Sequence, residues 1–296
     1  MVSQNRISHS ALGYLAALLA AASWGTSSVF LKLVFINSGV TALSLAFWRD
    51  LTTFLVLLVG LLLFRPDLLR AQRRDLRWLI AMGVTLGIFH VFWNLAVMLN
   101  GAAVATVQQA AMPAIASVVA WFIWREPLTW RKILAIVLTF AGTGLASGID
   151  ALGQMEVSPA GLLAGMAVTL LYAGWNLLGK KARQSNNALT VLAYAFGFGA
   201  LVLLPFQFFT EQPWPVSPIA LLWFVAFIGV STLLGFTIYT YALGHLPASV
   251  ASILAMSEVA FVMVYAYFLL DERLAAVQIM GAVLVVVGVA LLFRRK

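Results

Sequence analysis

Long apolar runs separated by short polar connections follow one another along the whole chain. Runs of about 20 apolar residues, the length that crosses roughly 30 Å of hydrocarbon, occur ten times. The predicted spans are residues 11–34, 41–64, 78–99, 102–124, 130–148, 159–179, 189–209, 219–243, 247–270 and 275–293. The sequence therefore predicts an all-α polytopic membrane protein of ten transmembrane helices, with its functional groups among the helices or at their ends.

Composition supports this class, because 63% of the residues are hydrophobic, 9% are charged and the mean hydropathy is +1.00. Such a chain has too little polar surface to cover a soluble globule. The absence of cysteine excludes disulfides and thiolate metal sites.

The positions of Lys and Arg predict the orientation, because cytoplasmic loops retain positive charge. With the N-terminus in the cytoplasm, most basic residues fall on the inner side: Arg6, Arg65, Arg70, Arg73, Arg74, Arg77, Arg125, Arg131, Lys132, Lys180, Lys181, Arg183, Arg294, Arg295 and Lys296. Only Lys32, Arg49 and Arg273 fall in the outer half, where we expect Arg49 to extend toward the surface. The net charge of +8 thus indicates topology and not nucleic-acid binding. We expect a bacterial inner-membrane protein with both termini cytoplasmic.

The two halves of the chain repeat one another, with the division predicted at residues 1–148 and 158–296. Aligned at an offset of 146, residues 101–145 meet residues 247–291 with these identities: Val104, Ala105, Phe122, Glu126, Leu128, Ile133, Val137, Leu138 and Gly142 with Val250, Ala251, Phe268, Glu272, Leu274, Ile279, Val283, Leu284 and Gly288. At an offset of 149, Gly25 and Lys32 meet Gly174 and Lys181. Five helices per repeat is an odd number, so we expect two inverted five-helix repeats, a common construction of secondary transporters. The alternative is a duplicated membrane scaffold without a pathway.

The sequence resembles the drug/metabolite transporter superfamily, in its EamA-like ten-helix form. The resemblance rests on "ALLAAASWGTSSVFLK", "LAFWRD", "MPAIASVVAWFIWREPLTW" and the echo of this last segment from "SEVAFVMVYAYFLLDER" onward. The aromatic-rich "FHVFWNLAVMLNGAAVATVQQAAMPA" is most similar to the amino-acid exporters of the YddG type, which implies export of aromatic and other neutral amino acids. One departure is that Val259 follows Glu258, where the family motif reads Glu-Pro.

One face of the third span presents three candidate substrate contacts. His90, Trp93 and Asn94 stand at i, i+3 and i+4, near mid-membrane. Polar side chains at this depth need hydrogen-bond partners, and a hydrated cavity provides them. The alternative is that His90 and Asn94 tie this helix to a neighbour, as polar residues do in many bundles.

The fourth span begins with Gln108 and Gln109 and is expected to bend at Pro113. Proline removes a donor and clashes with the preceding turn, so the Gln109 carbonyl is released for a polar ligand such as an ammonium group. Proline kinks are also common packing features of membrane helices. On equivalent faces of the repeats, Trp24 and Trp175 with Asn176 are predicted as wall residues.

Glu258, beside Ser257 in the ninth span, is interpreted as the one carboxylate clearly at the membrane centre. Three roles remain open: a proton carrier, a counter-charge for a substrate ammonium, and a hydrogen bond that locks helices. Its repeat equivalent is Met112, so the charge is not duplicated. We therefore expect downhill flux that does not strictly require a proton gradient.

The sequence lacks a Gly-rich phosphate loop, HExxH and GxSxG, and its three His are widely dispersed. We expect no enzyme activity, cofactor or metal. The predicted function is a secondary transporter, working as a monomer in the lipid bilayer, that exports amino acids with aromatic or other apolar side chains by alternating access. The alternatives are a multidrug or organic-cation exporter and, from another class, an intramembrane lipid-modifying enzyme.

Overall fold

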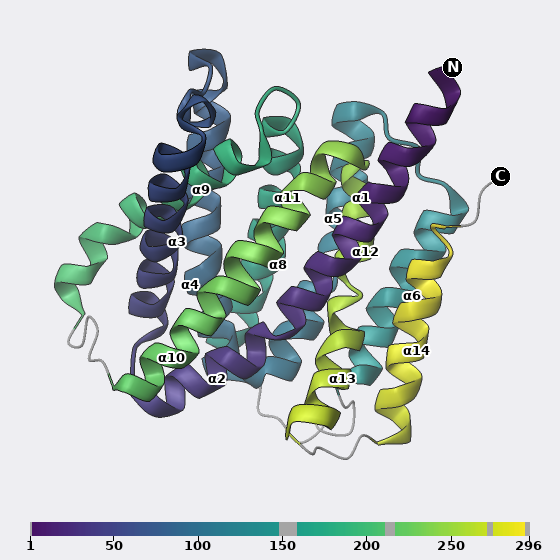
Figure 1. The fold of residues 1–296 in the computed structure, drawn as a ribbon. Helices are drawn as coiled ribbons and strands as arrows, with labels where there is room; N and C mark the ends of the chain where they lie inside the picture. Colours follow the sequence, from purple (N-terminus) through teal and green to yellow (C-terminus); the bar gives the residue numbers. More distant parts are fainter. Residues whose placement is uncertain (1, 148–158, 211–216, 271–274, 294–296) are drawn as a thin grey trace.

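The computed structural model describes residues 2–147, 159–210, 217–270 and 275–293, and all regular structure in these residues is helical. The elements are α1 (Val2–Gly25), α2 (Ser27–Ser38), α3 (Ala42–Phe64), η1 (Pro66–Leu69), η2 (Arg73–Asp75), α4 (Leu76–Gln109), α5 (Met112–Trp124), α6 (Trp130–Ala146), α8 (Pro159–Ala182), α9 (Ala188–Leu203), η3 (Leu204–Phe209), α10 (Pro218–Ala226), the π-helix η4 (Phe227–Leu234), α11 (Gly235–His245), α12 (Ala248–Ala255), α13 (Glu258–Leu270) and α14 (Ala276–Ala290). They form a single bundle of helices (Figure 1).

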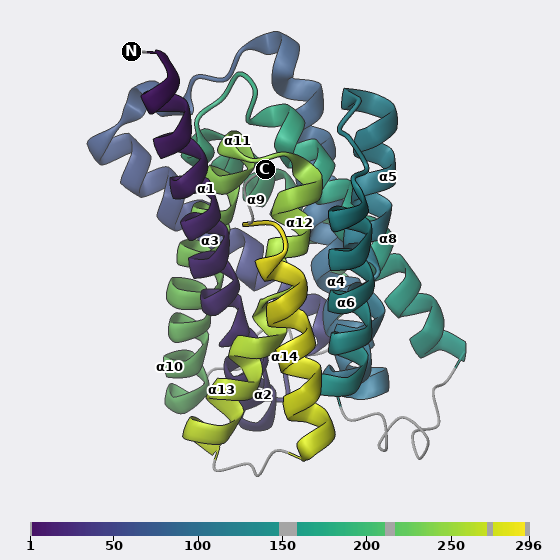
Figure 2. The same ribbon diagram turned by 90° about the vertical axis from the view of Figure 1, so that its right-hand side faces the viewer.

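Within the described residues, eight helical stretches are long and apolar enough to cross a membrane. They are Ala11–Ser38, Ala42–Phe64, Arg73–Leu99, Ala105–Trp124, Pro159–Ala182, Ala188–Phe209, Pro218–His245 and Ala248–Tyr265. Helix α14 is a shorter apolar helix, and α6 packs beside it (Figure 2). The predicted polytopic all-helical fold of two inverted five-helix repeats is thus confirmed. The third span and the start of the fourth both fall in α4.

Polar residues at the bundle ends begin several of these helices. The side chains of Thr41, Thr129, Asn187 and Ser217 each accept a hydrogen bond from a backbone N–H in the first turn of α3, α6, α9 and α10, respectively. Such N-caps satisfy donors that have no partner within the helix. These capping residues therefore define where α3, α6, α9 and α10 begin.

The contact between α6 and α14 displays the inverted repeat directly. A Cβ at Gly142 would lie 2.7 Å from the carbonyl oxygen of Gly281, and one at Gly288 would lie 3.1 Å from that of Ala135. At the offset of 146, Ala135 is equivalent to Gly281 and Gly142 is equivalent to Gly288. The contact of Gly142 with Gly281 is therefore equivalent to the contact of Gly288 with Ala135. Such reciprocal contacts are expected when two packed surfaces are related by a two-fold axis. The two helices are antiparallel, because the earlier residue of α6, Ala135, meets the later residue of α14, Gly288. Small residues allow the close approach.

Helix α1 begins and α14 ends at the same end of the bundle, where η1 and η2 also lie (Figure 1). The Arg residues of this connection, Arg65, Arg70, Arg73 and Arg74, are exposed. We call this end the basic end. Of the charges used for orientation, Arg273, Arg294, Arg295 and Lys296 lie outside the described residues.

Four helices are interrupted near the middle of the bundle in the described part of the chain. The first breaks at Thr26, between α1 and α2, and another contains the π-helix η4. The remaining breaks fall between α4 and α5 and between α12 and α13. The offset of 146 maps the last residue of α4 onto that of α12 and the first residue of α5 onto that of α13. The repeats are therefore broken at equivalent positions.

The two equivalent breaks use different chemistry. In the first repeat, Pro113 is the second residue of α5, directly after the break at 110–111; its role as a hinge stays a prediction. In the second repeat Val259 stands at this position, and the break forms without proline. There the Ser257 hydroxyl donates to the carbonyl of Leu254 at 2.7 Å, in competition with the backbone. The second repeat is therefore broken at this position although Val259 stands where the family motif has proline.

Candidate functional site

The interruptions surround a small polar cavity between the two halves. It is lined by Trp24, Ser27, Arg49, Phe89, Trp93, Gln109, Tyr172, Phe236 and Glu258. Its volume of about 40 Å³ holds a few water molecules. Helices interrupted around a site between repeats are typical of secondary transporters. A cavity of this volume admits water but no larger solute.

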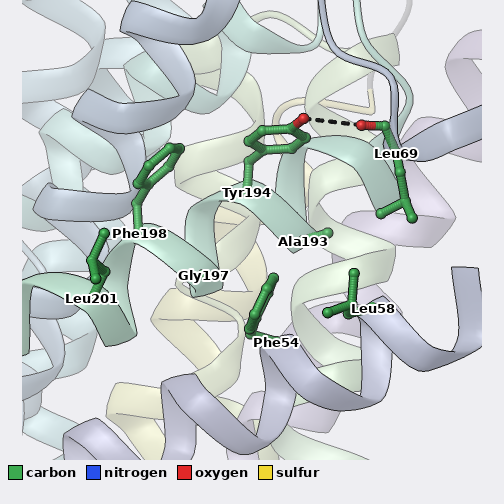
Figure 3. A pocket seen from close by; sticks show the side chains of 8 residues that line it. All are labelled: Phe54, Leu58, Leu69, Ala193, Tyr194, Gly197, Phe198 and Leu201. Carbon is green, nitrogen blue, oxygen red and sulfur yellow. Dashed lines mark hydrogen bonds between the residues drawn. The ribbon is translucent and has the colours of Figure 1, made fainter. Parts of the chain in front are cut away.

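A larger hollow of about 470 Å³ lies between α3, η1 and α9 (Figure 3). Its lining is apolar except for Tyr194, whose hydroxyl already donates to the carbonyl of Leu69 at 2.9 Å. Lipid tails suit such a surface, and it offers no charged group to a metabolite. We therefore place the candidate site at the smaller, charged cavity.

Arg49 supplies the positive charge of this cavity. Its side chain is 4% exposed, its Nε donates to the Thr232 hydroxyl at 3.1 Å, and its guanidinium lies 4.7 Å from the ring centroid of Phe227 and 5.3 Å from that of Phe236. The π-helix η4 provides Thr232 and Phe227, and α11 provides Phe236. π-Helices are frequent at functional sites. The expectation that Arg49 extends toward the outer surface was wrong, because its aromatic and hydroxyl partners all lie inside the bundle.

Glu258 supplies the acidic side chain of this cavity. It is the first residue of α13, where the free N–H groups and the helix dipole stabilise a carboxylate. Both charged side chains line the cavity, yet in the described residues no ion pair shorter than 4.0 Å joins Arg49 to Glu258. The basic and the acidic group of the lining are thus not joined to each other directly.

A second carboxylate, Asp50, is also buried in the bundle, so Glu258 is not the one central carboxylate that the sequence suggested. His90 Nδ1 lies 2.6 Å from Asp50 Oδ1, and both side chains are 0% exposed. The sequence interpretation placed His90 on the cavity wall, but the structure places it behind the lining, against Asp50. Of the predicted face of the third span, Trp93 lines the cavity.

The predicted amide contacts lie between helices. Asn94 donates to the carbonyl of Ala42 at 2.8 Å, Asn176 donates to the hydroxyl of Tyr239, and Gln108 Nε2 donates to the carbonyl of Gly161 at 3.4 Å. For Asn94, such a hydrogen bond to a neighbouring helix is what the alternative interpretation expected. Contact of these side chains with a substrate stays a prediction.

The other predicted wall residues are brought together. Trp24 and Trp175 pack with ring centroids 6.3 Å apart, and both contact Phe236 at 5.2 Å. Trp24 and Gln109 line the cavity, Trp175 is buried behind it, and Ser257 is buried in the break beside Glu258.

At the basic end, a polar cluster closes the bundle between the halves. Glu126 Oε1 accepts from the Ala248 N–H at 2.9 Å, its Oε2 accepts from the Ser249 N–H at 3.2 Å, and the Ser249 hydroxyl also donates to it. Lys132 Nζ donates to the Ser249 hydroxyl at 2.7 Å and lies 3.9 Å from Glu126. A carboxylate at the start of α12 complements the helix dipole. We call Glu126, Lys132 and Ser249 the basic-end latch.

The EamA-like transporter family matches residues 11–148 and 159–294, and the chain belongs to this family. It is therefore a membrane transporter of the drug/metabolite transporter superfamily. A transporter described as uncharacterized from Archaeoglobus fulgidus is 26% identical over 284 residues, covering 95% of this chain and 96% of that protein. The uncharacterized inner membrane transporter YicL of Salmonella typhimurium is 27% identical over 251 residues, covering 83% of each chain.

The relatives also include a probable terminal-alkyne amino-acid exporter from Streptantibioticus cattleyicolor, 24% identical over 284 residues, 95% of this chain and 93% of that one. One solved crystal structure of a protein superimposes with a TM-score of 0.80 and 18% identity, covering 95% of this chain and 96% of the other. This likeness supports the fold.

Sequence reasoning missed Arg49 and Asp50 as parts of the central site. A signal was present, because ionisable residues inside a transmembrane segment mark functional sites by default, and "RD" stands well within the second span. Their position within the span could be read from the sequence, whereas the direction in which each side chain leaves the helix could not.

Proposed function

We propose that this transporter exports neutral amino acids with aromatic or other apolar side chains across the inner membrane. The observation that carries the proposal is the pairing of one cation, Arg49, with one anion, Glu258, on the lining of a cavity with aromatic walls. An amino acid is complementary to this arrangement. Its carboxylate matches the guanidinium, which binds carboxylates in a bidentate manner, and its ammonium matches Glu258.

The walls suit an apolar or aromatic side chain. Trp24, Phe89, Trp93, Tyr172 and Phe236 contribute aromatic surface to the cavity. Aromatic pairs and buried apolar area stabilise a bound ring beyond what charge contacts provide. The name of the relative from Streptantibioticus cattleyicolor, an amino-acid exporter, agrees with this substrate class.

The second candidate is an organic-cation exporter, favoured by the same aromatic walls and by Glu258. Arg49 argues against it, because a fixed cation in the same small cavity repels a cationic ligand. Amino acids, which are neutral overall, satisfy both charges.

Alternating access fits the inverted repeats and the latch. The basic end carries the excess of Arg, which supports its assignment to the cytoplasm. In the described conformation the latch closes this end. Release of Glu126 from α12 would open the cavity to the cytoplasm, and substrate would enter from there.

The proposal is tested by ligands that lack one charge. Binding to protein in nanodiscs is followed by Trp fluorescence, since Trp24 and Trp93 line the cavity. Phenylalanine should bind at least about tenfold more tightly than phenethylamine, which lacks the carboxylate, or 3-phenylpropionate, which lacks the ammonium, because a charge-assisted contact contributes about 1.5 to 3 kcal/mol.

Matched variants assign each contact. Arg49→Gln should abolish the preference for phenylalanine over phenethylamine. Glu258→Gln should abolish the preference for phenylalanine over 3-phenylpropionate. Arg70→Gln removes an exposed positive charge at the basic end and should change neither ratio. Equal loss of all three ligands in either cavity variant, or tightest binding of phenethylamine to the unmodified protein, would contradict the proposal.

A further inference from the structure

The apolar hollow between α3, η1 and α9 extends from the basic end along the side of the bundle (Figure 3). Its α9 residues run from Ala193 to Leu201, which corresponds to about 12 Å of helix. Leu201 is 60% exposed, and Phe54 and Leu58 of α3 are half-buried, so the hollow opens toward the surrounding hydrocarbon. An elongated apolar hollow of this kind accepts an acyl chain.

The connection after α3 is fixed over one end of this hollow by two hydrogen bonds from α9. The Thr190 hydroxyl donates to the carbonyl of Leu68 at 2.6 Å, and the Tyr194 hydroxyl donates to that of Leu69 at 2.9 Å. Leu69 itself lines the hollow, and Arg70, the next residue, is exposed. A basic side chain therefore stands directly beside the hollow, on a segment whose backbone is held in place.

This connection carries more positive charge than its own acidic residues neutralise. From residue 65 to residue 77 the sequence has five Arg and two Asp. Asp67 accepts from Arg65 at 3.2 Å, and Asp75 accepts from the Ser185 hydroxyl at 2.7 Å. Three exposed side chains form no ion pair shorter than 4.0 Å within the described residues: Arg70, Arg73 and Arg74. A cluster of guanidinium groups thus lies at the membrane end of the hollow.

We propose that the hollow and the Arg residues after η1 form a binding site for an anionic phospholipid of the leaflet at the basic end. One acyl chain occupies the hollow, and the phosphate binds at Arg70 and its neighbours, since guanidinium groups bind phosphate in a bidentate manner. Basic clusters next to a membrane span attract anionic headgroups. A zwitterionic headgroup adds a cation that the same cluster repels. This site is separate from the central cavity and does not depend on the transported substrate.

The test uses two photoactivatable lipids with the same diazirine-bearing acyl chain, one a phosphatidylglycerol and the other a phosphatidylcholine. Each is added at equal mole fraction to the protein in phosphatidylcholine nanodiscs, and cross-linked peptides are mapped by mass spectrometry. Phosphatidylglycerol should label residues 193–201 at least about tenfold more than phosphatidylcholine does, because several Arg contacts favour it. Equal labelling of these residues by the two probes would overturn the proposal.

The protein contains an internal control for this experiment. A second apolar hollow, of about 380 Å³, lies between α13 and α14 and is lined by residues such as Met263 and Val283. We expect the two probes to label it equally. The same preference for phosphatidylglycerol at both hollows would show attraction to the whole protein surface, which would contradict a specific site.

Matched variants test the role of the Arg residues. Arg70→Gln/Arg74→Gln removes two exposed charges beside the hollow and should lower the preference for phosphatidylglycerol at residues 193–201 at least about tenfold. Arg125→Gln/Lys181→Gln removes two charges from other connections and should leave that preference unchanged. An equal loss in the two double variants, both folded, would refute the assignment of the headgroup to the connection after η1.

A soluble headgroup separates a lipid site from a phosphate site. Glycerol 3-phosphate carries the phosphate without an acyl chain, so in large excess it should not reduce labelling by the phosphatidylglycerol probe. Unlabelled phosphatidylglycerol should reduce it in proportion to its mole fraction. Competition by glycerol 3-phosphate would mean that the phosphate binds without the hollow, and the proposed two-part site would be wrong.

Discussion

The basic-end latch should control access to the cavity, and Glu126→Gln perturbs it with little change of shape. Glu126 accepts two backbone N–H bonds, of 2.9 and 3.2 Å, and a hydroxyl bond from Ser249, and it stands 3.9 Å from Lys132 Nζ. The amide of Gln keeps one oxygen acceptor and loses the charge. The variant therefore weakens the closed basic end and leaves the rest of the bundle unchanged.

The magnitude follows from these contacts. A hydrogen bond to a charged group contributes about 1.5 to 3 kcal/mol net, and loss of an N-cap costs about 0.5 to 2 kcal/mol. Because these two terms describe the same bonds, we take about 1.5 to 3 kcal/mol for the shift toward opening. At about 1.4 kcal/mol per factor of ten, the open population rises roughly ten- to a hundredfold.

Thiol labelling measures this shift without interference, since the chain has no native Cys. A reporter at Ala251, which is 0% exposed in α12, should react with an impermeant reagent at the basic end roughly ten- to a hundredfold faster when Glu126→Gln is present. Asp67→Asn neutralises a carboxylate that is 61% exposed and should leave the rate unchanged. A second reporter at Leu45, which is buried in a separate hydrophobic cluster with Leu31 and Phe227, should remain protected from the reagent. An unchanged rate at Ala251 would refute the gating role of the latch.

The remaining predictions concern packing and topology. Gly142→Val should lower the melting temperature, since its Cβ meets backbone oxygen at 2.7 Å and overpacking costs about 1 to 3 kcal/mol; Gly144→Val, with nothing within 4 Å, is the control and should be tolerated. Asn94→Ala should destabilise the protein by about 1 to 3 kcal/mol, visible as a lower melting temperature, because its bond to the α3 backbone is lost. Single-Cys reporters at Gln72 and Ser38 should label from opposite sides, Gln72 from the cytoplasm; labelling from one side would contradict the assigned topology.

Hydrophobic runs were sufficient to predict the helical bundle, because the bilayer requires one apolar helix per crossing. The repeat was also readable, and its offset of 146 reappears in the reciprocal contact of Gly142 with Gly281. The two breaks at equivalent positions were only half predicted. Pro113 marks the first, but the second has no proline and contains Ser257, whose hydroxyl donates to the carbonyl of Leu254.

The site was harder to predict, because its residues meet through helix rotation and register. Asp50 and His90 are 40 residues apart, and nothing in either segment alone pairs them. The environment of Arg49 depends on the π-helix that contains Thr232 and Phe227. The sequence pattern of that segment carries no signal that we could read for a π-helix. The position of each site residue within its membrane span could be read from the sequence, whereas the residue that it contacts on a neighbouring helix could not.

The measurement that tests the account most directly is counterflow into proteoliposomes with a panel of neutral amino acids and organic cations, with and without a pH gradient. The account predicts that phenylalanine and other apolar amino acids exchange without a pH gradient, that phenethylamine and larger organic cations do not compete, and that Arg49→Gln abolishes amino-acid exchange. Exchange of organic cations in preference to amino acids, or transport of amino acids only under an imposed pH gradient, would contradict it.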